Sequence, residues 1–278
     1  MKSDDGEYFL RGFSGKSGAL VLLLALCALF AAGGAFAKGN DARPIHLKNG
    51  VIIESIDAGH AAVVEGDAGL ASHAACPAST FKLVIAWAGL ETGRLQADTR
   101  IECREDRIAS GMIALDLHNA LIRSSNRYFE VVAGRIGIDR LAEYVRKSGL
   151  VAGEVPKNWL KQGVAAAIWG GDLRVTPFRL HDLMVRLSAG SLASRAVSEA
   201  LVAAIEWPAG TSGMRVYGKS GTMRGAAWFT GFAREKSGRT RVVTVFLRGG
   251  SARKSEAAER FFGRFGMKPP VLPPLGMN

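Results

Sequence analysis

The sequence predicts an α+β domain with α/β/α layers, in which one antiparallel sheet is flanked by N- and C-terminal helices and carries an inserted helical lobe. Two observations lead to this fold class. Short apolar runs broken by turn residues, the pattern of strands, occupy both ends of the chain at 51–66, 214–219, 226–234 and 241–248. Longer helical patterns occupy the middle, at 108–150 and 177–205, so strands from both ends are expected to share one sheet.

Turn residues predict two hairpins in this sheet. Asp57-Ala58-Gly59 interrupts the first strand pattern, as expected of the turn in a two-stranded hairpin. Glu235-Lys236-Ser237-Gly238 joins the last two strand patterns in the same way.

Apolar periodicity and breaker residues predict the helices. Apolar residues at helical spacing follow Ser79 and stop at Gly93, so a buried helix is expected to begin at Ser79. Pro177 is well placed in the first turn of a later helix. The run 251–265 is expected to form a closing amphipathic helix.

The first 37 of the 278 residues are expected to be an export signal. Lys16 precedes an uncharged stretch that ends in Ala35-Phe36-Ala37, which predicts cleavage before Lys38. The alternative is an uncleaved anchor, but the strongly apolar part, 19–32, is shorter than the roughly 20 residues of a spanning helix. We therefore expect a single domain at 38–278, periplasmic or secreted, with no stable membrane insertion after cleavage.

Charge and cysteine content exclude some partners. The formal net charge is +11, but the sequence has no polybasic run, which favours solubility and weak surface attraction over a nucleic-acid groove. The sequence lacks Cys-x-x-Cys and His-Glu-x-x-His, so we expect no metal site. In an oxidising compartment Cys76 and Cys103 could form one disulfide; the alternative is two buried thiols. Nothing in the sequence indicates the oligomeric state.

Ser79-Thr80-Phe81-Lys82 places a hydroxyl and an amine on one face of the expected helix, one turn apart. A lysine in a dry site beside a serine can accept its proton, which activates a serine nucleophile without a histidine. The alternative is a helix cap, because serine favours that position and Ser-x-x-Lys also occurs at Ser251 and Lys254.

Ser124-Ser125-Asn126 follows a helical run that spans 111–123. The Ser124 hydroxyl could relay a proton to a leaving nitrogen, and the Asn126 amide could orient a substrate carbonyl or the lysine. The alternative is polar capping of helix ends.

Lys219-Ser220-Gly221-Thr222 follows an apolar strand pattern. On a strand that lines a cleft, Lys219 would supply positive charge and Ser220 a hydrogen bond to a carboxylate, while Gly221 would allow close approach of a substrate.

In this order the three motifs resemble those of the penicillin-recognising serine enzymes, a family of β-lactamases, D,D-peptidases and transpeptidases. The chain is most similar to class D, or oxacillinase-type, β-lactamases over about 51–265. The resemblance implies a β-lactamase/transpeptidase-like fold, and β-lactam antibiotics or peptidoglycan stem peptides as partners. Further similar stretches lie at 77–82, 89–93, 228–231 and 253–255.

The resemblance implies a role for each matching residue. Ser79 would be the acylated nucleophile, Lys82 the general base, Ser124 the proton relay and Lys219 its electrostatic partner. The backbone N–H groups of Ser79 and Thr222 would form the oxyanion hole.

The resemblance also implies binding residues. Ser220 and Arg253 would hold the antibiotic's carboxylate, although Arg253 could equally be a solvated helix charge. No cofactor is expected, apart from carboxylation of the Lys82 Nζ by carbon dioxide, as is typical of class D. Trp169 would hydrogen-bond that carbamate; its alternative is an ordinary buried aromatic residue.

Two departures from the class D pattern bear on turnover. Asn126 stands where class D enzymes typically have Val, and a polar amide beside Lys82 could disfavour the carbamate, so that acylation is fast and release slow. The Tyr-Gly-Asn triplet usual in class D is missing after Leu141. Glu154 and Asn158 could position a hydrolytic water as in class A, although Glu154 is better explained as a loop charge.

We therefore expect an exported serine β-lactamase of class D-like fold. The alternatives are a penicillin-binding D,D-peptidase or transpeptidase, a penicilloyl-binding sensor that stays acylated, and a binding protein with an inactive site.

Overall fold

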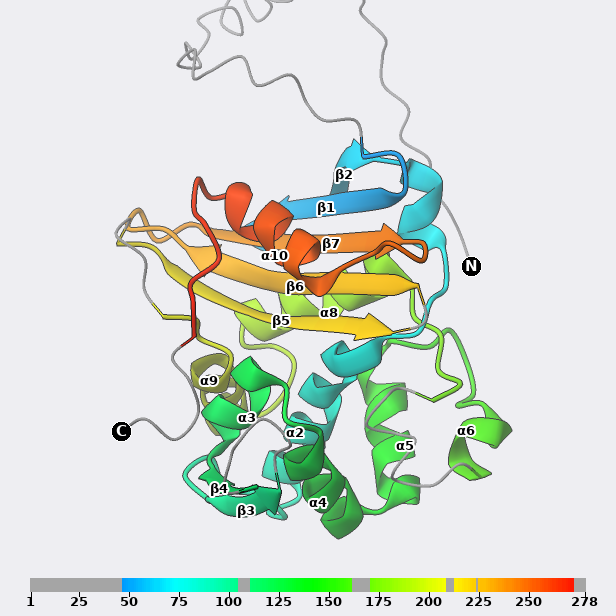
Figure 1. Ribbon diagram of the computed structural model, residues 1–278, viewed down its shortest axis with the longest axis vertical. Helices are drawn as coiled ribbons and strands as arrows, with labels where there is room; N and C mark the ends of the chain where they lie inside the picture. The colour runs from blue at the N-terminus through cyan, green and yellow to red at the C-terminus, as the bar shows by residue number, and fades with distance from the viewer. Residues whose placement is uncertain (1–46, 105–110, 162–170, 209–212, 224, 273–278) are drawn as a thin grey trace, which may run out of the picture. The chain divides into compact units, whose positions relative to one another are not determined.

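The computed structural model describes residues 47–104, 111–161, 171–208, 213–223 and 225–272 (Figure 1). The leader expected at 1–37 lies outside the described residues, as does Trp169. The described residues form one compact unit. Among the helices that are described, none is long and apolar enough to cross a membrane.

A five-stranded sheet joins the two ends of the chain, as expected from the strand patterns (Figure 1). Every pair of neighbouring strands is antiparallel. The sequence therefore predicts the fold class correctly. The order across the sheet is β2 (Ala62–Gly66), β1 (Gly50–Ile56), β7 (Thr240–Arg248), β6 (Ala226–Arg234) and β5 (Arg215–Met223).

The turn between β1 and β2 has the geometry that its sequence predicts. Asp57 and Ala58 have φ angles of 50° and 59°, in the left-handed region that suits a tight hairpin. The Asp57 Oδ1 atom accepts a hydrogen bond of 2.7 Å from the backbone N–H of Thr240, which ties the turn to β7.

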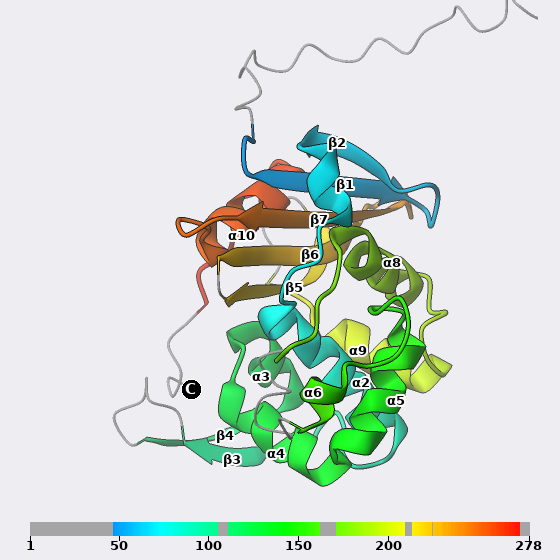
Figure 2. The ribbon, with the colours of Figure 1, turned by 90° about the vertical axis from the view of Figure 1, so that its right-hand side faces the viewer.

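Helices cover both faces of the sheet (Figure 2). Successive residues of β6 and β7 point to opposite faces. On one face, Phe229 and Val245 pack with Phe261 and Phe262 of α10 (Lys254–Gly263). The other face packs against α8 (Pro177–Ser188) and the helical lobe, where it contributes residues such as Trp228 and Phe246.

The helical lobe is built around α2 (Lys82–Glu91), in which each residue from Lys82 to Gly89 is buried. A helix that is apolar on all sides is typical of a core position. The 3-10 turns η1 (Ala68–Ser72) and η2 (Ala78–Phe81) precede it. Around it lie α3 (Leu117–Arg123), α4 (Asn126–Ile136), α5 (Ile138–Ser148), α6 (Lys157–Lys161) and α9 (Arg195–Ala204).

The expected helical run 111–123 is wrong in its first part. Met112–Leu115 is a strand, β4, that pairs with β3 (Ile101–Arg104). The helix begins only after Asp116, whose side chain accepts a hydrogen bond from the backbone N–H of Asn119. A short apolar run fits a strand or a buried helix equally well by periodicity, and here pairing with β3 decided the outcome.

Cys76 and Cys103 do not form a disulfide. Both are buried thiols. The Cys76 Sγ atom lies 4.0 Å from the Met223 Sδ atom, and the Cys103 thiol donates to the backbone oxygen of Ile101 over 3.3 Å. The alternative of two buried thiols is therefore correct, and the disulfide expectation is wrong.

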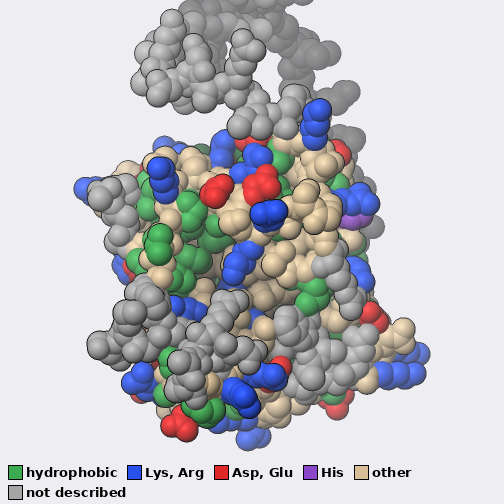
Figure 3. Space-filling model, viewed as in Figure 1, with side chains coloured by type: hydrophobic (Ala, Val, Ile, Leu, Met, Phe, Trp, Pro, Cys, Tyr) green, Lys and Arg blue, Asp and Glu red, His purple; other side chains and the backbone are tan. Residues whose placement is uncertain are grey.

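Lys and Arg side chains on the face seen in Figure 3 are scattered and do not form a single stripe. Within the described part of the chain, no group of His, Cys, Asp and Glu is arranged to hold a metal ion. The expectations about nucleic acid and metals stay predictions.

Candidate active site

Ser79 lies in η2, which leads directly into the buried helix α2. The segment before it is fixed by two hydrogen bonds. Trp228 on β6 donates its indole N–H to the backbone oxygen of Cys76 over 2.9 Å, and the Thr80 hydroxyl donates to the backbone oxygen of Pro77 over 2.6 Å. The bond from Trp228 ties this segment to the central sheet, and Ser79 is half-buried in the 3-10 turn before α2, which begins at Lys82 and not at Ser79 as the sequence predicts.

Gly221 on β5 allows the sheet to approach this segment closely. A Cβ atom built at Gly221 would lie 3.0 Å from the backbone nitrogens of Ser79 and Thr80, and 3.2 Å from the backbone oxygen of Pro77. The atoms in the way are backbone atoms, so a larger residue would push the strand and the serine apart. The sequence predicts that Gly221 makes room for a substrate, which stays a prediction; in the structure the segment that approaches it closely is the backbone of η2.

Ser124 and Asn126 come from the junction of α3 and α4. Ser124 ends α3 in the left-handed conformation, with φ 64° and ψ 40°, which is strained for a residue other than glycine. Ser125 caps α4 by accepting the backbone N–H of Tyr128 over 3.1 Å. The capping role thus falls to Ser125, and its two neighbours are left to face Lys82.

Lys82 is fully buried, and four oxygen contacts surround its Nζ atom. The distances are 3.2 Å to Ser79 Oγ, 2.9 Å to the Ser124 backbone oxygen, 3.3 Å to Ser124 Oγ and 2.6 Å to Asn126 Oδ1. The amine also lies 5.9 Å from the centroid of the Phe129 ring. Sequence reasoning missed Phe129, although it follows Asn126 by three residues on α4 and therefore shares its face.

Lys219 brings a second amine to the same hydroxyl. Its Nζ atom donates to Ser124 Oγ over 3.0 Å and to the backbone oxygen of Ser220 over 2.9 Å. Burial, and then the nearby charges of Lys82 and Lys254, lower the pKa of Lys219 well below its ordinary value. Burial is the main cause, because a dry site disfavours a charged amine, so the positive charge expected of Lys219 from the sequence is less favourable here than on an exposed lysine.

Five of the expected site residues thus form one hydrogen-bonded network: Ser79, Lys82, Ser124, Asn126 and Lys219. Ser220 is buried and Thr222 is exposed on the same strand. Arg253 is exposed at the N-cap of α10, and among the described residues no hydrogen bond or ion pair joins it to the network. The neighbouring Lys254 acts electrostatically on Lys219, a contribution that the motifs did not indicate.

The remaining candidates add no contact to this network. Glu154 and Asn158 are both exposed, which fits the interpretation of Glu154 as a loop charge. Trp169 lies outside the described residues. The catalytic and binding roles of all these residues stay predictions.

Comparison with known proteins was consistent with this geometry. A family model described as the penicillin-binding protein transpeptidase domain matches residues 65–194, a range that contains Ser79, Lys82, Ser124 and Asn126. No curated protein matches.

Solved structures with a similar fold include several β-lactamases. The BPu1 β-lactamase is 17% identical with a TM-score of 0.67, and the alignment covers 78% of this chain and 92% of that one. A class D β-lactamase from Bacillus subtilis is 19% identical with a TM-score of 0.65 and the same coverage. The OXA-427 class D β-lactamase is 17% identical with a TM-score of 0.64, over 78% of this chain and 97% of that one.

The fold and the matched segment confirm the resemblance to the penicillin-recognising serine enzymes. The architecture matches the class D β-lactamase fold.

Proposed function

We propose that this protein opens β-lactam antibiotics by acylation of Ser79 and hydrolyses the acyl-enzyme slowly, with Lys82 as an unmodified general base. The observation that carries the proposal is the 3.2 Å contact between Lys82 Nζ and Ser79 Oγ inside a buried site. A nucleophile and a base within hydrogen-bond distance are the minimum that serine acyl transfer requires.

The contacts of Lys82 suit a neutral amine that acts as a base. Such an amine has two N–H groups and one lone pair. The Ser124 backbone oxygen and Asn126 Oδ1 can only accept, so they take the two N–H groups at 2.9 and 2.6 Å. The lone pair is then left for the Ser79 hydroxyl, which passes its proton to Nζ as Oγ attacks the lactam carbonyl.

Ser124 is arranged to deliver a proton to the departing nitrogen. Its Oγ atom accepts a hydrogen bond from Lys219 at 3.0 Å, and it lies 3.3 Å from Lys82 Nζ, which can donate to it once the proton from Ser79 has given Lys82 a third N–H group. Its own proton is therefore free to move to the lactam nitrogen when the C–N bond breaks. Lys82, protonated in the first step, can restore the proton to Ser124.

The tetrahedral intermediate and the substrate carboxylate need donors from β5 and η2. We assign the oxyanion hole to the backbone N–H groups of Ser79 and Thr222, because Gly221 brings these two segments into backbone contact. We assign the antibiotic's carboxylate to Ser220 and Arg253, with Lys254, whose charge acts on Lys219, adding positive charge nearby.

Asn126 disfavours carboxylation of Lys82. Addition of carbon dioxide replaces one N–H by a carboxylate and releases a proton, so the carbamate nitrogen keeps a single N–H. Either the Ser124 backbone oxygen or Asn126 Oδ1 would then lose the N–H group that it accepts from Lys82. The new carboxylate would also lie beside Asn126 Oδ1, which is 2.6 Å from Nζ in the unmodified protein. Without a carbamate to activate water, we expect release of the acyl group to be slower than acylation. A protein with this activity works outside the cytoplasm, where the leader predicted at 1–37 would deliver it.

Peptide mapping after incubation with benzylpenicillin tests the proposal. We expect one penicilloyl group per chain on Ser79, followed by release of penicilloate. Ser79→Ala should abolish both, whereas Ser72→Ala, which changes an exposed serine on η1, should change neither. Acylation that survives Ser79→Ala would overturn the proposal.

A second candidate is a D,D-peptidase or transpeptidase that acts on peptidoglycan stem peptides. It is favoured by the bond between Asn126 and Lys82 and by the match to a transpeptidase domain. The same network would attack a peptide carbonyl, with Ser124 protonating the leaving amine. Release of the terminal residue from a stem peptide, faster than hydrolysis of benzylpenicillin, would favour this candidate over a β-lactamase.

A further inference from the structure

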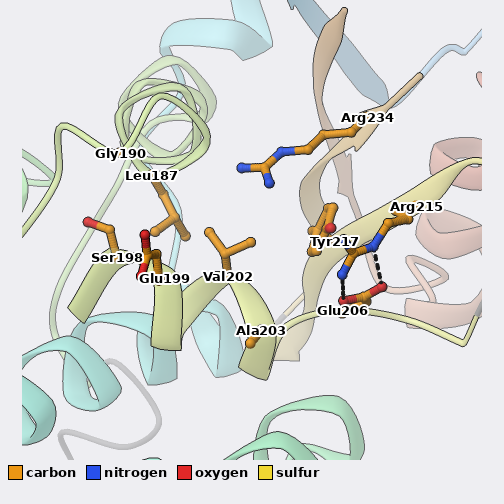
Figure 4. Close-up of a pocket in the computed structure, with 10 residues that line it drawn as sticks. All are labelled: Leu187, Gly190, Ser198, Glu199, Val202, Ala203, Glu206, Arg215, Tyr217 and Arg234. Atoms are coloured by element: carbon orange, nitrogen blue, oxygen red, sulfur yellow. Dashed lines mark hydrogen bonds and ion pairs between the residues drawn. The ribbon is translucent and has the colours of Figure 1, made fainter. Parts of the chain in front are cut away.

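A pocket lies at the beginning of β5, outside the catalytic network. It has a volume of about 240 Å³ and is bordered by α9, the end of α8 and the adjoining ends of β5 and β6 (Figure 4). None of its lining residues belongs to the catalytic network. The pocket therefore needs an explanation that is independent of the proposed function.

The acidic side chains of the pocket are already neutralised. Glu206 makes two bonds with Arg215, of 2.8 and 2.6 Å, which Figure 4 shows as dashed lines. Glu199 is paired with Arg195 at 2.8 Å. Neither carboxylate is a strong site for a cation.

Arg234 is the one lining cation that, within the described part of the chain, has no ion pair. Its guanidinium donates to the backbone oxygen of Ser188 over a long 3.5 Å and lies 5.3 Å from the centroid of the Tyr217 ring. In Figure 4 the Arg234 side chain extends across the pocket toward α8 and α9. It presents planar, bidentate donors to whatever occupies the space.

Tyr217 supplies a second unused donor. The residue is 1% exposed, and its hydroxyl proton has no acceptor among the described residues, because the group beside it is the Arg234 guanidinium, which can only donate. Burial, and then Glu206, raise the pKa of Tyr217, so the hydroxyl stays protonated. A buried donor without an acceptor costs roughly 1–3 kcal/mol, which a bound acceptor would recover.

Apart from Ser198, whose hydroxyl donates to the backbone oxygen of Ala193, the remaining side chains of the wall are apolar. Leu187 and Val202 point into the pocket from α8 and α9 (Figure 4). A dry apolar cavity of about 150 Å³ can hold benzene, so the larger volume here is enough for one ring or a branched chain with a carboxylate.

We propose that this pocket binds a small organic monoanion, a carboxylate with a compact apolar body. The ligand's carboxylate binds Arg234 and accepts a hydrogen bond from the Tyr217 hydroxyl, and the ligand's apolar body lies against Leu187 and Val202. Tyr217 precedes Lys219 by two residues and so faces the same side of β5, which puts the occupant on the catalytic strand but outside the catalytic site.

Isothermal titration of the full-length protein with benzoate, and with benzamide as its neutral isostere, tests the proposal. We expect saturable binding of benzoate and binding of benzamide at least about tenfold weaker, since the charged contact with Arg234 is lost. Arg234→Gln should weaken benzoate binding by a similar factor, and Tyr217→Phe by a smaller one. Arg239→Gln, the same charge change at an exposed position outside the pocket, should leave binding unchanged.

Three results would overturn the proposal. They are the absence of benzoate binding, equal binding of benzoate and benzamide, and binding that survives Arg234→Gln but is lost in Arg253→Gln. The last would place the anion in the carboxylate subsite of the catalytic cleft. Circular dichroism of each variant establishes that it is folded, and the titrations do not depend on the outcome of the acylation experiments.

Discussion

Replacement of Asn126 by Val should slow acylation by the unmodified Lys82 amine and allow Lys82 to be carboxylated. The change removes the acceptor at 2.6 Å from Nζ and leaves the contacts with Ser79 and Ser124. Lys82 is fully buried, so no water compensates. Loss of a hydrogen bond to a charged or polarised group of this kind costs about 1.5–3 kcal/mol, which corresponds to a roughly 10- to 150-fold slower acylation if the bond orients the base.

The same variant should gain a dependence on bicarbonate. With the Asn126 oxygen gone, a carboxylate on Nζ no longer faces a carbonyl, and an apolar neighbour favours the neutral amine that reacts with carbon dioxide. Stopped-flow hydrolysis of benzylpenicillin, with and without bicarbonate, measures the rates, and ¹³C NMR with labelled bicarbonate detects the carbamate. For Asn126→Val we expect a carbamate signal, and hydrolysis that is faster with bicarbonate than without it. For the wild type we expect no carbamate signal and no effect of bicarbonate.

Asn126→Asp is the matched control for this pair of experiments. It keeps an acceptor beside Lys82 but adds a negative charge, which favours the ammonium form and removes the base. Its acylation should therefore be slow, with no rescue by bicarbonate. If the wild type already gives the carbamate signal and depends on bicarbonate as strongly as Asn126→Val, our account of Asn126 is refuted.

Three further predictions concern the relay, the packing of the site and the core. Ser124→Ala should slow acylation by benzylpenicillin by at least about tenfold, measured by quenched-flow mass spectrometry, because the leaving nitrogen loses its proton donor; an unchanged rate would exclude the relay. Gly221→Ala should lower both the melting temperature and the acylation rate, since its Cβ would meet backbone at 3.0 Å, whereas Gly153→Ala, with no heavy atom within 4 Å, should do neither; equal effects would contradict the packing argument. Burial lowers the pKa of His181 from 6.5 to about 4, so the unfolded chain binds more protons between these values and stability falls as the pH drops through them. Denaturant titration should show that the free energy of unfolding is about 2 kcal/mol lower at pH 5 than at neutral pH, and His181→Gln should lack this difference. Identical pH dependence in the two proteins would contradict this role of His181.

Local sequence signals predicted the parts of the fold that depend on local chemistry. The hairpin turn at Asp57 and Ala58 and the helix start at Pro177 both occur where their residues indicate. The strand Met112–Leu115 was missed, because four apolar residues carry no period of their own and become a strand only by pairing with Ile101–Arg104.

The composition of the site was more predictable than its geometry. The three motifs named the residues, but nothing local shows that Ser124 adopts a left-handed conformation or that Asn126 contacts the amine of Lys82. Those features arise where α3 and α4 meet α2, which is a contact between distant parts of the chain. The disulfide expectation failed for a similar reason, because the sequence separation of Cys76 and Cys103 does not give the distance between them in the fold. The pocket at Tyr217 could not be predicted from the sequence, because Arg234 lies on β6 and meets Tyr217 only when β6 pairs with β5.

Time-resolved intact mass spectrometry with benzylpenicillin, with and without bicarbonate, tests the central claim most directly. It separates acylation from release in one experiment. We predict a single penicilloyl adduct on Ser79 that forms quickly, decays slowly as penicilloate accumulates, and decays at the same rate with bicarbonate. If no adduct forms under either condition, Ser79 is not a penicillin-reactive nucleophile; if bicarbonate accelerates its decay, Lys82 does not act as an unmodified base.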